Sequence, residues 1–248
     1  MRIAVVIPAR FSSTRFPGKP LADIKGKTMI QRVFEQCQKT LDNVYVATDD
    51  NRIMEEVEKF GGKGIMTSAK HQSGTDRLAE AAEILKEKKN QTFDIIVNVQ
   101  GDEPFIQPEQ IKELIGCFEN SNTEIATLIK ETSSNEEIFN PNIPKVVINK
   151  NSEAMYFSRS PIPYLRNVEK EKWHKHHSFY KHIGMYGYRY DILKKITQLE
   201  PSSLETAESL EQNRWLENGY HIKVAFTQYE NHSIDTPEDL AEVSNKMR

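Results

Sequence analysis

The sequence predicts an α/β fold with a Rossmann-like, mostly parallel twisted sheet that carries helices on both faces. The opening run at residues 3–7 consists of Ile, Ala and Val and is bounded by Pro8. Such a run is typical of a strand that is buried on both faces, as in a parallel sheet. A second such run follows at residues 93–99. As far as about residue 130, strand patterns alternate with helix patterns, which is the order that gives a parallel sheet covered on both faces.

Apolar periodicity and capping residues predict the individual elements. Helices are expected over residues 28–39, from Asp49 or Asp50 to the glycines at 61–62, from Ser73 or Thr75 onward, over residues 204–218 and from Pro237 onward. Further strands are expected over residues 43–48, 63–66, 145–149, 154–158, 181–188 and 221–226. A chain of 248 residues is long enough to bury a sizeable core, and we expect a single domain over residues 1–248.

The alternation ends after residue 140, where a long segment with prolines and histidines interrupts the strands. Loops longer than about 12–15 residues in a compact domain are usually functional or lie at an interface. We therefore expect an inserted lid or dimerisation element at about residues 156–181, and a homodimer. The histidines at 174, 176 and 177 are expected to lie in a solvated loop, because no Cys or acidic residue stands at ligand spacing from them.

The composition is that of a soluble protein with no electrostatic preference for nucleic acid or an anionic membrane. Charged residues make up 28% of the chain, and the net charge is −3. The N-terminal apolar run is too short for a signal peptide, and no stretch approaches the roughly 18 apolar residues of a transmembrane helix. Cys37 and Cys117 lack the spacing of a disulfide framework. These features predict a cytoplasmic protein with reduced cysteines.

The loop after the first strand concentrates positive charge at residues 10–20. It holds Arg10, Arg15 and Lys19 together with three hydroxyl residues and a Pro-Gly turn. In open α/β sheets, ligands bind beyond the carboxyl ends of the strands. Guanidinium and ammonium groups placed there suit a polyphosphate, whose charge they neutralise while N–H groups and hydroxyls donate hydrogen bonds. The alternative is an ordinary solvated basic loop.

Two further segments supply carboxylates. Asp102 follows the strand at residues 93–99 and should project at the same sheet edge as the basic loop. A carboxylate beside a triphosphate is useful if Mg²⁺ lies between them, although a Gly-Asp-Glu-Pro segment can also be a plain polar turn. Near the C-terminus, Pro237 at a first helical position makes Thr236 the N-cap, with Asp239 completing a box-like cap. Asp235 is then left without a capping role and can bind a cation.

The helix that begins near Ser73 offers an anion site. The free N–H groups and the positive end of its dipole favour an anion, and Arg77 adds a guanidinium. Gln72 and His71 directly precede the helix and are further candidates for binding a ligand. The alternative is a helix cap with a surface arginine.

The strand at residues 181–188 should place His182, Gly184 and Tyr186 on one face. Histidine and tyrosine donate hydrogen bonds, and glycine permits close approach, so this face suits the carboxylate and hydroxyls of a sugar acid. The alternative is a histidine with a purely structural role.

The pattern Arg-x-x-Ser-Thr-Arg-x-Pro-Gly-Lys-Pro at residues 10–20 resembles the nucleotide-binding signature of the sugar and sugar-acid nucleotidyltransferases. The similarity is greatest to the 3-deoxy-manno-octulosonate (Kdo) cytidylyltransferases, also called CMP-Kdo synthetases. It extends to residues 71–77, 100–104, 182–188, 211–212 and 235–239, and therefore over nearly the whole chain.

The resemblance implies a nucleotidyltransferase fold and a role for each segment. Asp102 and Asp235 would bind Mg²⁺ and, with Arg10 and Lys19, form the catalytic set. The nucleotide CTP would be bound by Pro8, Ala9, Arg10, Ser13, Arg15, Lys19, Ser73 and Gln100. Kdo would be bound by Gln72, Arg77, His182, Tyr186, Glu211 and Gln212.

The expected activity is therefore the transfer of a cytidylyl group from CTP to Kdo, giving CMP-Kdo and pyrophosphate for lipopolysaccharide biosynthesis. Other hypotheses are a cytidylyltransferase for 8-amino-Kdo or a sialic acid, a sugar-1-phosphate uridylyltransferase, and a non-catalytic module that senses nucleotide. A glycosyltransferase is disfavoured, because the expected Asp-x-Asp position is Gly101-Asp102-Glu103.

Overall fold

The computed structural model describes residues 1–248 except 13–14, 72, 133, 232 and 247–248, and gives no side-chain environment for 243–246. The chain forms two compact units. The first unit comprises residues 1–112, 188–197 and 230–248, and the second comprises residues 113–187 and 198–229. The expected single domain, and the lid or dimer role of residues 156–181, stay predictions.

The first unit contains the predicted parallel sheet. Its strands are β1 (Ile3–Ala9), β4 (Val44–Thr48), β5 (Gly64–Met66) and β6 (Ile95–Asn98), in the order β6-β1-β4-β5. Every pair is parallel, and the register aligns Val6 of β1 with Tyr45 of β4 and with Asn98 of β6. The carboxyl ends of β1 and β6 therefore lie side by side. β1, β4 and β6 are almost wholly buried, as their apolar composition predicts, whereas Met66 at the end of β5 is exposed.

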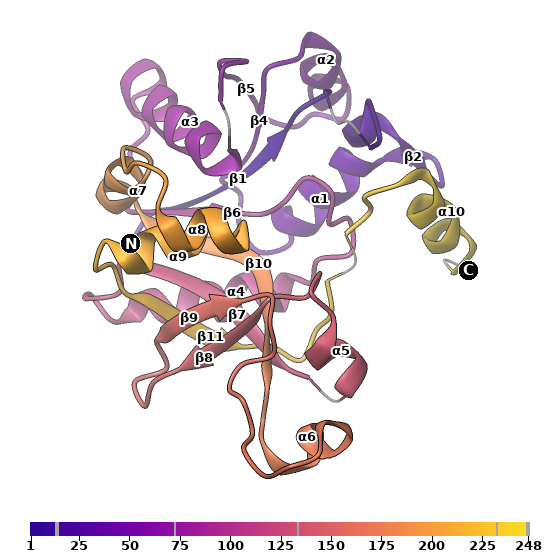
Figure 1. Ribbon diagram of the computed structural model, residues 1–248. Coiled ribbons are helices and arrows are strands. Elements are labelled where there is room, and N and C mark those ends of the chain that lie inside the picture. Colours follow the sequence, from indigo (N-terminus) through magenta and orange to yellow (C-terminus); the bar gives the residue numbers. More distant parts are fainter. Residues whose placement is uncertain (13–14, 72, 133, 232, 247–248) are drawn as a thin grey trace. The chain divides into compact units, whose positions relative to one another are not determined.

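Helices cover both faces of this sheet, as expected. Figure 1 shows β1 and β4 between α3 (Gly74–Lys89) on one side and α1 (Met29–Gln38) and α2 (Asn51–Lys59) on the other. The side chains of Thr28, Asp50 and Ser73 accept hydrogen bonds from backbone N–H groups in the first turns of α1, α2 and α3. The apolar stripe of α3 is buried, including Leu78 and Leu85.

Short elements complete the first unit. They are the 3₁₀ turn η1 (Lys19–Leu21), the small hairpin of β2 (Asp23–Ile24) and β3 (Lys27–Thr28), the start of α4 (Pro108–Gly116), α7 (Tyr190–Ile196) and α10 (Pro237–Lys246). Ile234, just before α10, packs with Ile24 and Met29 in a small buried cluster. That cluster ties the C-terminal segment to the rest of the unit.

The second unit combines parallel and antiparallel strands. β7 (Ile125–Glu131) pairs in parallel with β11 (Ile222–Phe226), and β7 also neighbours β10 (Tyr180–Arg189), of which residues 180–187 belong to this unit. β8 (Lys145–Ile148) pairs antiparallel with both β10 and β9 (Ala154–Ser158). The remaining elements are η2 (Cys117–Glu119), α5 (Asn135–Phe139), η3 (Lys170–Lys172), α6 (Trp173–His176), α8 (Ser203–Glu208) and α9 (Glu211–Glu217).

The expectation of one helix over residues 204–218 is wrong. The segment is divided into α8 and α9, because Ser209 adopts a left-handed conformation with φ of 52°. A left-handed residue ends the hydrogen-bond ladder of a helix. Apolar periodicity did not reveal the break, because α9 resumes with its own buried residue, Trp215.

The excursion at residues 156–181 has a core of its own. Trp173 is buried against Ile138 and Phe179, and the rings of Trp173 and Phe179 stack with centroids 5.8 Å apart.

Cys37 is buried, Cys117 is partly buried, and both are free thiols. In the part of the chain that the structure describes, no helix has the length and apolar character needed to cross a membrane.

The predicted common face of β10 is confirmed for its aromatic members. The rings of His182 and Tyr186 lie 5.2 Å apart, and Phe157 packs edge-on to His182 at 5.1 Å. The Nε2 atom of His182 lies 3.0 Å from the Thr127 hydroxyl. Burial in this aromatic setting lowers the pKa of His182 to about 4.

This lowered pKa predicts a loss of stability in acid. Below its ordinary pKa of 6.5, the unfolded chain binds a proton at His182 that the folded protein takes up only near pH 4. Stability is therefore fully present above pH 6.5 and falls as the pH drops towards 4, by about 2 kcal/mol between pH 8 and pH 5. Urea unfolding at several pH values should show this loss in the wild type and a smaller loss in His182→Gln. Parallel losses in the two proteins would contradict the assignment.

Candidate active site

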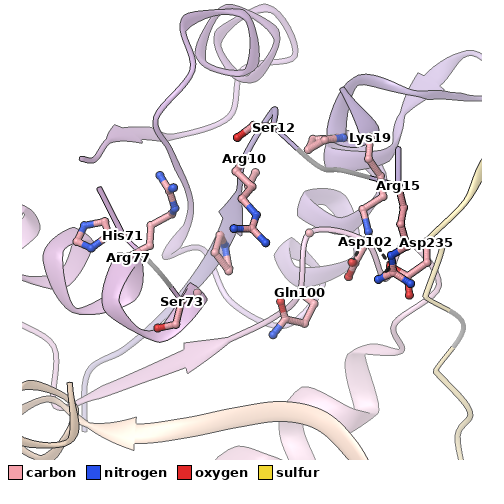
Figure 2. Close-up of a pocket in the computed structure, with 15 residues that line it drawn as sticks. Arg10, Ser12, Arg15, Lys19, His71, Ser73, Arg77, Gln100, Asp102 and Asp235 are labelled. Atoms are coloured by element: carbon pink, nitrogen blue, oxygen red, sulfur yellow. Dashed lines mark hydrogen bonds and ion pairs between the residues drawn. The ribbon is translucent and has the colours of Figure 1, made fainter. Parts of the chain in front are cut away.

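A cleft of about 360 Å³ lies in the first unit at the carboxyl ends of β1 and β6. Its lining contains most of the site residues predicted for this unit: Pro8, Ala9, Arg10, Arg15, Lys19, Ser73, Arg77, Gln100, Asp102 and Asp235. His71 lines it as well, and so does Ser12, which the sequence analysis did not single out. Ser13 and Gln72 lie outside the described residues. Figure 2 shows His71, Ser73 and Arg77 at one end of the cleft, Asp102 and Asp235 at the other, and Arg10 between them.

The cleft owes its shape to a close contact between two loops. β6 leads into the turn that carries Gln100 and Asp102, and this turn packs against the end of β1. A Cβ atom on Gly101 would stand 2.8 Å from the Pro8 carbonyl oxygen, a separation that real Cβ atoms do not adopt. Glycine is therefore required at this position, and the contact holds Asp102 beside the basic loop.

Four charged side chains meet at one end of the cleft. The Lys19 ammonium lies 2.6 Å from Asp102 Oδ2 and 3.2 Å from Asp235 Oδ1. A guanidinium nitrogen of Arg15 lies 3.1 Å from the same Asp235 oxygen. The predicted meeting of Asp102 with Asp235 is thus observed, with Lys19 between them (Figure 2).

Asp235 is presented by the helix cap that the sequence predicts. The Thr236 hydroxyl accepts from the Asp239 N–H at 3.2 Å, and Asp239 Oδ2 accepts from the N–H groups of Thr236 and Asp235, each at 2.9 Å. These hydrogen bonds fix the backbone at Asp235 and leave its carboxylate free to face the cleft.

A buried polar chain connects the two acidic segments. The Ile234 N–H donates to the Asp102 carbonyl at 3.0 Å. The Asn231 amide donates to the Glu103 carboxylate, and its oxygen accepts from Gln110 at 2.7 Å. Burial and then the charge of Asp102 raise the pKa of Glu103 to about 8, against the opposing effect of the Asn231 hydrogen bond. No sequence signal marked Asn231, because its partners are 121 and 128 residues away.

The two carboxylates are suited to a hard divalent cation. Mg²⁺ is usually held by one or two protein carboxylates, with substrate phosphates and water completing its coordination. Asp102 and Asp235 direct oxygens at one point, which Lys19 reaches from the cleft wall. Within the described ranges, no group of three or more His, Cys, Asp or Glu side chains could hold a metal by itself.

At the other end of the cleft, the basic residues have acidic partners. Arg77 is buried and donates to Asp49 at 2.9 Å and to the Thr67 hydroxyl at 2.7 Å. His71 lies 2.5 Å from a carboxylate oxygen of Glu80. Asp49 and Glu80 therefore orient two residues expected to face a ligand, and both supporting acids were missed in the sequence.

The Ser73 hydroxyl is engaged in a helix cap. It accepts from the N–H of Asp76 at 3.1 Å, and the Asp76 carboxylate accepts in return from the Ser73 N–H. This is a complete capping box. Ser73 still lines the cleft beside Gly74, and its role in nucleotide binding stays a prediction.

Four of the residues predicted to bind the sugar acid, His182, Tyr186, Glu211 and Gln212, belong to the second unit. The Tyr186 ring packs edge-on to Trp215 of α9, with centroids 5.2 Å apart. Burial and then the negative charge of Glu211 raise the pKa of Tyr186 well above its usual value. The Glu211 carboxylate accepts from Arg214 at 2.8 Å, and Gln212 is buried.

Two side chains attach this segment to β9 on either side of Glu211 and Gln212. The Glu208 carboxylate accepts from the Arg159 N–H at 2.9 Å and from the Ser158 hydroxyl at 2.6 Å. The fully buried Asn213 amide bonds to both the N–H and the carbonyl of Phe157, at 3.3 and 3.0 Å. The start of α9 is therefore held to one strand from both sides, an arrangement that the sequence analysis did not predict.

The histidine-rich loop lines a hollow within the second unit. His174, His176 and His177 line a hollow of about 820 Å³ in the second unit, beside Val147 and Ile162. His176 and His177 are exposed, as expected for a solvated loop.

The chain is similar to known proteins over nearly its whole length. A family model described as cytidylyltransferase matches residues 4–224. A 3-deoxy-manno-octulosonate cytidylyltransferase of Parabacteroides distasonis is 59% identical over 244 residues, covering 97% of this chain and 96% of that protein. A protein of the same description from Cytophaga hutchinsonii is 58% identical over 246 residues, covering 98% of this chain and 96% of its own.

Solved structures give the same result. The structure of a CMP:2-keto-3-deoxy-manno-octonic acid synthetase complexed with CTP matches with a TM-score of 0.90 and 41% identity, covering 100% of this chain and 98% of that one. A putative glucose-1-phosphate thymidylyltransferase from Bacillus anthracis matches at 0.62 with 17% identity, covering 99% and 96%, and shares the fold. The chain belongs to the cytidylyltransferase family of nucleotidyltransferases, among the 3-deoxy-manno-octulosonate cytidylyltransferases.

Proposed function

We propose that the protein transfers the cytidylyl group of CTP to Kdo, giving CMP-Kdo and pyrophosphate for lipopolysaccharide biosynthesis in the cytoplasm. The observation that carries this proposal is the cleft in which a basic loop faces two carboxylates at the carboxyl edge of a parallel sheet. Relatives that are 46–59% identical carry the name of this activity, and the similar solved structure is described as complexed with CTP. We also propose that the protein acts as a homodimer.

The reaction forms one P–O bond and breaks another. The anomeric hydroxyl oxygen of Kdo attacks the α-phosphorus, the bond to the β-phosphate breaks, and pyrophosphate leaves. The hydroxyl proton passes to water as the oxygen bonds to phosphorus, and the proposal assigns no residue as general base. Positioning and neutralisation of charge supply most of the rate in such transfers.

Each group of residues then has a part in the proposal. Arg10, Ser13, Arg15 and Lys19 hold the triphosphate, and Pro8, Ala9, Ser73 and Gln100 hold the rest of the nucleotide. Gln72, Arg77, His182, Tyr186, Glu211 and Gln212 bind and orient the sugar acid. Asp102 and Asp235 hold Mg²⁺, which when bound neutralises phosphate charge and polarises the reacting oxygens.

Pyrophosphate release is the direct test of the activity. The protein should be supplied with CTP and Mg²⁺, and separately with Kdo, 8-amino-Kdo, a sialic acid and a hexose-1-phosphate. Release with Kdo is the expected result. Release only with another acidic sugar would replace the substrate, and tight CTP binding without release from any acceptor would favour a nucleotide-sensing module.

Removing one carboxylate should stop turnover without unfolding the protein. Asp235→Asn should reduce kcat by at least about a hundredfold, because a lost ligand removes several kcal/mol of charge stabilisation. Its melting temperature should stay near that of the wild type, since its partner Arg15 is mostly exposed and its other partner, Lys19, keeps the shorter contact with Asp102. Asp191→Asn, which removes an exposed acid of α7, is the matched control. Near-normal activity of Asp235→Asn would remove it from the metal site.

The attachment of α9 to β9 should matter for the sugar acid and not for the nucleotide. Glu208→Gln keeps one acceptor oxygen in place of two, so it cannot accept from both the Arg159 N–H and the Ser158 hydroxyl, and Glu211 and Gln212 should be held less firmly. We expect the KM for Kdo to rise about tenfold and the KM for CTP to change less than about twofold. The control Glu217→Gln likewise leaves one acceptor oxygen in place of two, here for Ser203 and Leu204 at the far end of the same helix pair. Equal changes in both KM values would indicate a general structural defect.

A further inference from the structure

We propose that Lys19 is an internal cation that competes with the divalent metal for Asp102 and Asp235, so that nucleotide binding opens the metal site by drawing Lys19 away. This inference rests on the proposed function, in which these two carboxylates hold the metal. It adds a second role for Lys19 beyond holding phosphate, namely coupling between the metal and the nucleotide.

The geometry places the Lys19 ammonium where a shared cation would bind. Lys19 Nζ contacts one oxygen from each carboxylate, at 2.6 Å from Asp102 and 3.2 Å from Asp235. A metal held by the same two oxygens would stand about 2.0–2.1 Å from each. The ammonium and the ion cannot both occupy that space, so one must leave for the other to bind.

Lys19 is held in this position more firmly than a surface lysine would be. Its side chain is only 13% exposed, and its backbone belongs to η1, which follows the left-handed Gly18. Exposed ion pairs contribute little, whereas a shielded pair interacts more strongly because the effective dielectric constant is lower. Displacing Lys19 therefore costs free energy, which lowers the affinity of the site for a metal ion that binds without nucleotide.

The charges at this end of the cleft also favour binding of the metal together with the nucleotide. Lys19 and Arg15 together offset Asp102 and Asp235 in a four-charge cluster. A divalent cation added alone would leave an excess of two positive charges. A triphosphate removes that excess, and it gives both basic side chains new anionic partners in the same cleft, where Arg10 also lies.

The side chain of lysine is suited to such an exchange. Its ammonium sits on a flexible four-carbon stem and can move between acceptors without a change in the backbone. Metal and nucleotide then favour each other's binding, and the coupling must be equal in both directions. The site would accept the divalent cation together with the nucleoside triphosphate and bind the cation poorly without it.

Metal binding by the nucleotide-free protein tests the inference without any turnover. We would titrate Mn²⁺, as a spectroscopic substitute for Mg²⁺, into the wild type and Lys19→Met, and measure bound ion by electron paramagnetic resonance. Removing the competing ammonium should tighten Mn²⁺ binding about tenfold, although the same change weakens CTP binding. Binding by Lys19→Met that is no tighter than that of the wild type would overturn the inference.

Three controls separate this inference from the proposed function. Lys19→Arg keeps a cation between the carboxylates and should bind Mn²⁺ as the wild type does. Lys27→Met removes the lysine of an ion pair with Glu35 in the same unit, and should also leave Mn²⁺ binding unchanged. Asp102→Asn in the Lys19→Met background should abolish the tightened binding.

The controls distinguish a failure of this inference from a failure of the proposed function. If Asp102→Asn reduces Mn²⁺ binding but Lys19→Met does not increase it, the metal site stands and the competition is wrong. If Asp102→Asn leaves all Mn²⁺ binding unchanged, the carboxylates do not hold the metal and the proposed function loses its metal site as well. Melting curves for each variant identify any that fail to fold, and in that case Lys19→Ala takes the place of Lys19→Met.

Discussion

The parallel pairing of β1 with β6 is the constraint on which the cleft depends. It brings the basic loop after β1 and the acidic turn after β6 to the same edge of the first unit's sheet. Opposite charges at such a short separation attract strongly, yet each also loses hydration. The contact of Gly101 with the Pro8 carbonyl shows how closely the two loops are pressed together. A side chain at position 101 would clash with the Pro8 carbonyl and force one of the two loops to shift.

Both units hold their functional side chains through hydrogen bonds to the backbone nearby. In the first unit, Asp239 and Thr236 cap α10 and so present Asp235, and in the second unit Asn213 and Glu208 bond to β9 beside Glu211. The side chains that do this supporting work are not those expected to touch substrate. This separation leaves the functional carboxylates able to exchange partners when a ligand arrives, while their backbone stays fixed.

Features set by neighbours in the sequence could be predicted, and features set by distant residues could not. The strands at residues 3–7 and 43–48 and the Thr236 cap follow from apolar runs and capping chemistry within a few residues. The approach of Asp102 to Asp235 was expected only from the resemblance to a known family. Lys19 between the carboxylates, and Asn231 beside Glu103, join residues 83 to 216 positions apart, and no local pattern encodes such pairs. The left-handed Ser209 was missed because a polar residue at a helix end has several possible conformations.

The arrangement of charge also explains why a loop with so many basic residues is compatible with an acidic protein. The chain carries a net charge of −3, so its overall field does not attract a nucleotide. The local cations must therefore supply that attraction, and Lys19, which is mostly shielded from water, has a stronger effect than a surface lysine would have. Pairing Lys19 and Arg15 with Asp102 and Asp235 keeps these cations in place at little cost in repulsion. The same pairing holds two carboxylates where a metal can bind. The cluster of four side chains can therefore bind both the metal and the phosphates of a metal–nucleotide complex.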